Sequence, residues 1–79
     1  MSTPAMSPAL AKRRFEFVQG TSNKFWEITL HGNETVVMYG RIGTNGCAIC
    51  KPFASNVEAI KHAEKLIREK TAKGYVEAV

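Results

Sequence analysis

Apolar and polar residues alternate in two early stretches of the chain, with the period of two that is typical of β-strands. In "KRRFEFV", Phe15 and Phe17 alternate with Arg14 and Glu16, which predicts a half-buried strand. Further on, "KFWEITLHGNETVVMYGRIG" contains two alternating runs on either side of a glycine–asparagine pair. Such a pair is a turn signal, so this stretch predicts a β-hairpin.

The length of the hairpin loop decides which side chains share a face of the sheet. A two-residue loop would place Trp26 opposite Tyr39, whereas a three-residue loop would place Trp26 opposite Gly40. A slip of one residue exchanges the two faces, so the choice matters. We prefer the three-residue loop because it gathers the apolar residues on one face. Tyr39 and Arg41 then lie on the other face, with Phe25 near Arg41.

A second turn follows at "TNGC". Asn-Gly is a strong signal for a two-residue hairpin loop, and it predicts a return strand in "CAICKPF". In that register Ile49 lies beside Ile42. Pro52 ends regular pairing unless it lies at a sheet edge or a strand end.

The helical period appears only after this strand. Ser55 and Glu58 have the spacing of a capping box, which predicts a helix that runs to about Ala72. Gly74 has the position of a residue that ends a helix. The buried stripe of this helix is predicted to contain Ala59, Ile60, Ala63, Leu66 and Ile67. The polar residues, with His62 among them, are predicted to face water.

These elements predict an α+β fold, a small twisted antiparallel β-sheet of four or five strands with one α-helix packed on one face. The fifth strand is left open, because "YVEAV" either adds a short strand or docks on the core. Nothing in the chain is predicted to cover the other face of the sheet. That face is therefore the place where we expect a partner.

Length and composition predict one domain without a membrane segment. The chain has 79 residues, and "MSTPAMSPALA" at residues 1–11 carries no charged side chain. We interpret residues 1–11 as a disordered leader and residues 12–79 as a single domain. No apolar run approaches the roughly 20 residues that cross a bilayer, and no secretory signal is evident. Cytoplasmic residence is expected.

Charge favours an acidic partner. Eleven Lys and Arg residues outnumber seven Asp and Glu residues, giving a formal net charge of +4. Clustered cations of this kind suit nucleic acid, although many small basic proteins bind none. No serine or cysteine has a nearby histidine base, and no inward-facing pair of carboxylates is evident. We therefore predict no enzyme activity, no cofactor and no small-molecule substrate.

The two cysteines form a C-x-x-C sequence. Zinc needs four ligands, and the chain adds only two distant histidines, His31 and His62, to Cys47 and Cys50. Residues three apart on a strand point to opposite faces, so this pair neither chelates a metal nor closes a disulfide without distortion. The sequence predicts reduced cysteines and no metal site.

The "YGR" triplet at residues 39–41 is the candidate binding motif. Alternation sends Tyr39 and Arg41 to the same face and Gly40 to the opposite one. An aromatic ring can stack on a base for about 1–3 kcal/mol, and a guanidinium group can make a forked contact with phosphate. A purely structural interpretation also fits, in which Tyr39 packs, Arg41 pairs with a glutamate and Gly40 lets Trp26 lie over it.

The chain resembles a WGR domain over residues 13–79. The resemblance rests on "GRIGTNG" preceded by an aromatic residue, on "NKFWEITL" upstream and on "EAIKHAEKLIREKTAKGY" downstream. This module is named for a Trp-Gly-Arg triplet and occurs in poly(ADP-ribose) polymerases and in bacterial proteins. The resemblance implies an antiparallel sheet with one helix and recognition of DNA strand breaks near a 5′ end. The motif positions are Tyr39, Gly40 and Arg41, so tyrosine replaces tryptophan and offers a smaller stacking face.

These observations predict a non-catalytic module that binds nucleic acid, at a DNA end or nick. No polymerase catalytic domain accompanies the motif, so any downstream partner would be a separate chain. The alternative is a protein-interaction module that uses the uncovered sheet face, because aromatic residues and arginine are enriched in such contacts. The predicted site residues are Tyr39, Gly40, Arg41, Phe25, Arg13, Arg14, Lys24 and Lys51.

Overall fold

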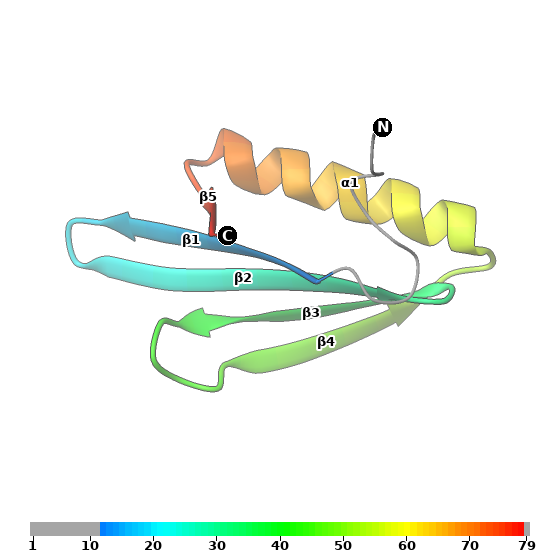
Figure 1. Ribbon diagram of the computed structural model, residues 1–79, viewed down its shortest axis with the longest axis horizontal. Helices are drawn as coiled ribbons and strands as arrows, with labels where there is room; N and C mark the ends of the chain where they lie inside the picture. Colours follow the sequence, from blue (N-terminus) through cyan, green and yellow to red (C-terminus); the bar gives the residue numbers. More distant parts are fainter. Residues whose placement is uncertain (1–11, 79) are drawn as a thin grey trace.

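The computed structural model describes residues 12–78 and contains one five-stranded antiparallel sheet and one helix. The strand order is β4-β3-β2-β1-β5 (Figure 1). The elements are β1 (Lys12–Gln19), β2 (Ser22–His31), β3 (Glu34–Arg41), β4 (Cys47–Pro52), α1 (Asn56–Ala72) and β5 (Val76–Ala78). The predicted α+β fold is confirmed, and the final segment forms the fifth strand. The predicted leader at residues 1–11 lies outside the described residues.

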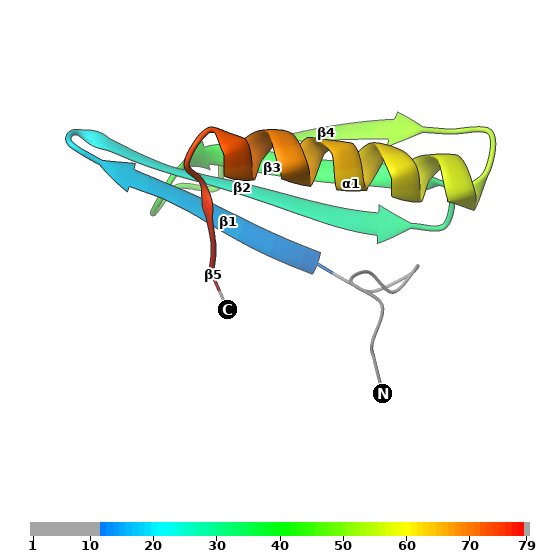
Figure 2. The same cartoon turned by 90° about the horizontal axis from the view of Figure 1, so that it is seen from above.

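The helix covers one face of the sheet, as the sequence predicted. Seen from above, α1 runs along β2 and β3, with β4 beside it and β1 on its other side (Figure 2). Ala59 and Ala63 are fully buried, and their small side chains let the helix approach the sheet closely. The core consists of Phe15, Trp26, Ile28, Leu30, Val37, Ala59, Ala63 and Ile67.

Both ends of α1 follow the local sequence signals. The Ser55 hydroxyl oxygen accepts a hydrogen bond from the Glu58 N–H at 3.2 Å, which confirms the predicted N-cap. At the other end, the Gly74 N–H donates to the Thr71 carbonyl and the Tyr75 N–H donates to the Lys70 carbonyl, both at 3.1 Å. This pair of bonds is a Schellman motif. It leaves Gly74 with a φ of 107°, which suits glycine.

The preferred register of the β2–β3 hairpin is wrong. His31 pairs with Glu34 across a two-residue loop, so Trp26 lies opposite Tyr39. Trp26 belongs to the helix-covered face, and Tyr39 therefore lies on that face as well. Because β3 has apolar residues on both faces, the apolar pattern alone did not fix the register.

Turn geometry and distant contacts select the observed register. Gly32 has a φ of 66°, whereas no residue other than glycine has a positive φ within residues 12–78, a combination that suits a II′ turn with glycine first. The turn is also held by the segment that leads into the helix. The Asn33 amide donates to the Phe53 carbonyl at 2.7 Å, and the Phe53 N–H donates to the Asn33 carbonyl at 2.8 Å.

The connection between β3 and β4 also differs from the predicted two-residue loop. Tyr39 pairs with Cys47, so Ile49 lies opposite Val37 and not beside Ile42. The intervening residues fold back over the helix-free face. A Cβ atom on Gly46 would lie 2.4 Å from the Tyr39 carbonyl oxygen and 2.8 Å from the Phe25 ring. This close approach needs glycine at position 46.

The cysteines lie on opposite faces, as predicted. Cys47 pairs with Tyr39 on the helix side and Cys50 pairs with Val36 on the other side, and both thiols are free and exposed. Within residues 12–78, no helix has the length and apolar character needed to cross a membrane.

Candidate functional site

A groove of about 400 Å³ runs between α1 and strands β2 to β4. Its position follows from the fold, because α1 packs on β2 and β3 and leaves the helix side of edge strand β4 uncovered (Figure 2). The apolar and aromatic lining includes Trp26, Val37, Tyr39, Ile49, Leu66 and Tyr75. The basic lining consists of Lys24, Lys51, Lys70 and Lys73. Glu69 is the one carboxylate that lines the groove within residues 12–78.

Basic side chains gather where the helix ends. Lys70 and Lys73 come from the last turn of α1 and the residue after it, and Lys24 lies near the start of β2. Burial lowers the pKa of Lys70, and the neighbouring charges of Lys73 and Lys24 lower it further. Arg41 pairs with Lys24 across the strands. We call these four residues the cationic end of the groove.

Aromatic rings support this cationic end. The Lys70 ammonium nitrogen lies 5.6 Å from the Trp26 ring centroid and 5.3 Å from that of Tyr75. The Lys24 ammonium nitrogen lies 5.5 Å from the Phe17 ring, which is itself 5.3 Å from Tyr75. Cation–π attraction at these distances helps to hold like charges together. Within residues 12–78, none of the four cations forms an ion pair with a carboxylate.

Tyr39 stands at the rim of the groove. It is 41% exposed, whereas its cross-strand neighbour Trp26 is 4% exposed. The Tyr39 ring is therefore accessible to a ligand, while Trp26 belongs mainly to the core. Gly40 follows it, and a Cβ atom there would lie 2.8 Å from the Gly46 Cα atom. The glycine of the triplet thus admits the folded-back loop.

The other end of the groove holds a histidine that was predicted to be solvated. The His62 ring lies 4.9 Å from the Phe53 ring, and the residue is only partly exposed. Burial lowers the pKa of His62, and the charges of Lys51 and Lys65 lower it further. The low pKa favours the neutral imidazole near pH 7, so the positive charge at this end comes from Lys51.

The structure brings together about half of the residues predicted for the site. Tyr39, Gly40, Lys24 and Lys51 line the groove, and Arg41 is exposed beside Lys24. Tyr39 and Arg41, however, lie on the helix-covered face and not on the helix-free face that was predicted for them. The hairpin register is the reason for the change of face.

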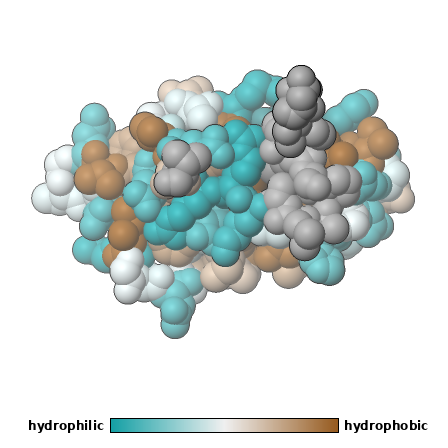
Figure 3. Space-filling view, in the orientation of Figure 1, coloured by the Kyte–Doolittle hydropathy of each residue, from teal (hydrophilic) through white to brown (hydrophobic). Residues whose placement is uncertain are grey.

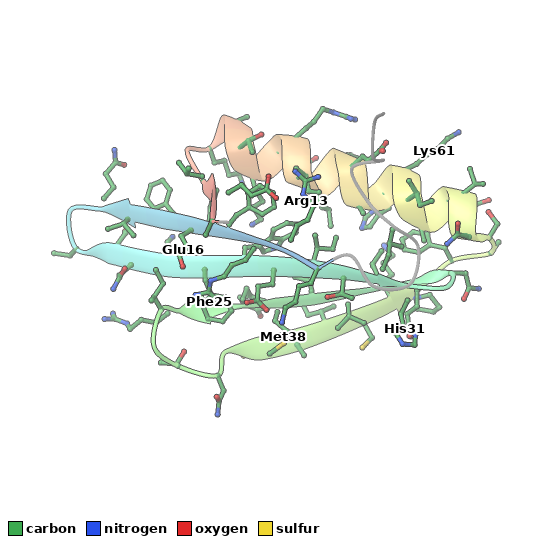
Figure 4. All side chains as sticks on the ribbon, viewed as in Figure 1. Arg13, Glu16, Phe25, His31, Met38 and Lys61 are labelled. Carbon is green, nitrogen blue, oxygen red and sulfur yellow. The ribbon has the colours of Figure 1, made fainter. Side chains whose placement is uncertain are left out.

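Phe25 also contributes to the lining of the groove, but its ring is placed differently. It pairs with Gly40, and its ring is directed to the side of the sheet away from α1 (Figure 4). It is 4% exposed, between the Gly46 backbone and the Arg14 guanidinium group, which lies 4.6 Å from the ring centroid. Phe25 therefore supports the folded-back loop from beneath.

Arg13 and Arg14 are held by carboxylates away from the groove. Arg13 makes two hydrogen bonds to Glu77, at 2.8 and 2.7 Å, and this contact ties β5 to β1. Arg14 bonds Glu16 at 2.9 Å and Glu27 at 2.6 Å on the helix-free face. Figure 3 shows hydrophilic side chains over the middle of the face in view, with hydrophobic side chains toward its left end.

Sequence reasoning missed Lys70 and Tyr75 as part of the site. A signal was present, because Lys70 follows Ala59, Ala63 and Leu66 at helical spacing and so continues the buried stripe. A lysine on an apolar stripe lays its methylene chain along the core and keeps its charge at the rim.

Comparison with known proteins identifies the family. The WGR domain family matches residues 11–79 of the chain. A crystal structure of a protein from Bacteroides fragilis is similar, with a TM-score of 0.86 and 49% sequence identity over 87% of this chain and 20% of that one.

Two proteins of Escherichia coli K12 are also similar. The uncharacterized protein YfeS is 41% identical over 66 residues, which is 84% of this chain and 27% of YfeS. Protein YehF is 40% identical over 65 residues, which is 82% of this chain and 24% of YehF. The chain thus spans about a quarter of the length of these relatives. WGR domains are nucleic-acid-binding modules associated with poly(ADP-ribose) polymerases. The chain belongs to the WGR domain family.

Proposed function

We propose that this protein binds DNA at ends or nicks through the helix-side groove, without catalysing a reaction. The observation that carries the proposal is the cationic end. Lys24, Lys70 and Lys73 line the groove there, and Arg41 lies across the strands from Lys24. None of the four has a carboxylate partner within the described residues. Phosphate is the complementary ligand for such a cluster. Tyr39, at the adjoining rim, supplies an exposed aromatic face for a sugar or base.

The lowered pKa of Lys70 supports an anionic ligand. Its shift arises from burial and from repulsion by Lys73 and Lys24. A bound phosphate would neutralise that repulsion and raise the pKa of Lys70 again. The groove therefore gains more from an anion than three isolated surface lysines would.

A protein partner on the helix-free face has less support. The charged residues Arg14, Glu16, Glu27 and Lys12 already pair with one another there. A partner would need to displace or cover these pairs. We therefore propose the groove, and not the helix-free face, as the binding surface of a module that acts in the cytoplasm.

The test is fluorescence anisotropy with nicked, 5′-phosphorylated and intact duplexes across a salt series. Tyr39→Ala and Arg41→Ala should each weaken binding by about 1–3 kcal/mol. Lys61→Ala is the matched control, because Lys61 is an exposed cation on the side of α1 that points away from the sheet (Figure 4). Unchanged affinity in both groove variants, or an equal loss in the control, would remove the assignment.

A further inference from the structure

The groove continues past the cationic end into an uncharged section. Along β3, Tyr39 and Val37 follow Arg41 on the same face in steps of two residues, or roughly 7 Å each. Ile49 from β4 and Leu66 from α1 form the two walls at this level. We call this section, with Trp26 as part of its floor, the apolar middle of the groove.

The size and lining of the apolar middle suit one flat apolar group. The whole groove has a volume of about 400 Å³, which lies near the lower limit of small-molecule sites. A duplex is far too wide for such a space, but a single nucleoside is not. Ile49 is 52% exposed and Tyr39 is 41% exposed, so apolar area on both remains open to a ligand.

From this arrangement we infer that the groove takes one unpaired nucleobase at a DNA end, with its phosphate on the cationic end and its base in the apolar middle. The inference rests on the proposed function and specifies the preferred DNA, which is an end with an unpaired nucleotide. Charge complementarity fixes the direction, because the phosphate belongs beside Lys24, Lys70 and Lys73. The base then lies between Tyr39 and Leu66, where stacking and burial replace contact with water.

Paired bases cannot enter in this way, so an end with an unpaired nucleotide is bound more tightly than a blunt end. Stacking of one base corresponds to on the order of tenfold in affinity. The preference arises from the base and not from the additional phosphate.

Three 5′-phosphorylated duplexes separate these contributions in an anisotropy titration of the full chain. One is blunt, one carries a single unpaired 5′ nucleotide, and one carries an abasic nucleotide at the same position. We expect the unpaired nucleotide to bind on the order of tenfold more tightly than the abasic one. Equal binding of these two would overturn the inference and leave the proposed function intact. Absence of binding to all three would overturn the proposed function and, with it, this inference.

A pair of variants on one strand tests the location. Ile49→Gln places a polar amide in the wall of the apolar middle without changing charge, and Ile49 is exposed enough for the fold to tolerate the change. Ala48→Gln is the matched control on the opposite face of β4. In Ile49→Gln the unpaired and the abasic nucleotide should bind with nearly equal affinity. In Ala48→Gln the preference for the unpaired nucleotide should persist. A preference that persists in both variants would overturn the assignment of the base to this groove.

Discussion

Each face of the sheet has an aromatic residue near cationic side chains, but the two faces differ in whether the ring is buried and whether the cations are paired with carboxylates. On the helix-free face, Arg14 lies over Phe25, but Phe25 is buried and Arg14 is paired with Glu16 and Glu27. On the helix-covered face, Tyr39 is exposed and the nearby lysines have no carboxylate partners within residues 12–78. An aromatic residue beside a cation is therefore not by itself a binding site. What matters is whether each group is already satisfied within the fold.

We expected a partner on the helix-free face, but this difference favours binding on the helix-covered face. The helix does not close its side of the sheet, because α1 is directed along β2 and β3 and leaves a groove toward β4. It also contributes Lys70 to the basic lining of the groove. The uncovered face is instead closed by its own ion pairs and by the folded-back loop at Gly46.

The largest expected effect concerns the aromatic residue of each face. Phe25→Ala should lower the free energy of unfolding by about 3–5 kcal/mol, because it removes a buried ring and leaves a cavity beneath the loop. Tyr39→Ala should lower it by only about 1 kcal/mol, since Tyr39 is 41% exposed. Urea denaturation of both variants measures the difference. Similar losses would contradict the division into a structural and a ligand-binding aromatic residue.

The next effect concerns the cations. Lys70→Ala should weaken DNA binding by about 1 kcal/mol and reduce the salt dependence by the equivalent of one phosphate contact. Arg14→Gln should leave affinity and salt dependence nearly unchanged, because Arg14 is already neutralised by Glu16 and Glu27. Anisotropy titrations at several salt concentrations check both. A greater loss of DNA affinity in Arg14→Gln than in Lys70→Ala would contradict the proposed groove and indicate that DNA binds on the helix-free face.

A smaller effect follows from the lowered pKa of His62. Because the folded state favours neutral His62, the unfolded chain binds more protons below the ordinary histidine pKa of about 6.5. The stability contributed by the neutral ring is thus present above that pH and is lost as pH falls. His62→Gln should reduce the loss of stability between about pH 7.5 and about pH 5, as measured by urea denaturation. His31→Gln, at an exposed position, is the control and should leave the loss unchanged.

The smallest effect concerns the ion pair between β1 and β5. Arg13→Gln should lower the free energy of unfolding by at most about 1 kcal/mol, because both side chains remain partly exposed. Arg13 also lowers the pKa of Glu77 by hydrogen bonding, so this stability is present above the ordinary glutamate pKa and is lost as pH falls. DNA affinity should not change. A clear loss of DNA affinity in anisotropy titrations would contradict this prediction and indicate that Arg13 is part of the binding surface.

The sequence was sufficient where local signals determine structure. Ser55 and Gly74 predicted the ends of α1, because capping depends on residues within one turn of the helix end. Alternation predicted the strands for the same reason. The face that carries Tyr39 could not be predicted, since β3 is apolar on both sides and Asn33 fixes the turn through its contact with the distant Phe53.

The site was predicted only in part. Tyr39, Lys24 and Lys51 were found through the motif and through charge, but the motif gave no information on what the helix adds. Lys70 joins them only after α1 has packed on the sheet, which is a tertiary event with no short-range sequence signal except the continued stripe. Arg14, which was also predicted for the site, lies on the helix-free face, where its carboxylate partners come from its own and the adjacent strand.

The most direct test of the groove is a chemical-shift map of the protein on addition of a short 5′-phosphorylated duplex. We predict the largest shifts at Lys24, Tyr39, Arg41 and Lys70, with little change at Glu27 on the helix-free face. Shifts centred on Glu27 and its neighbours, with the groove residues unmoved, would contradict the account.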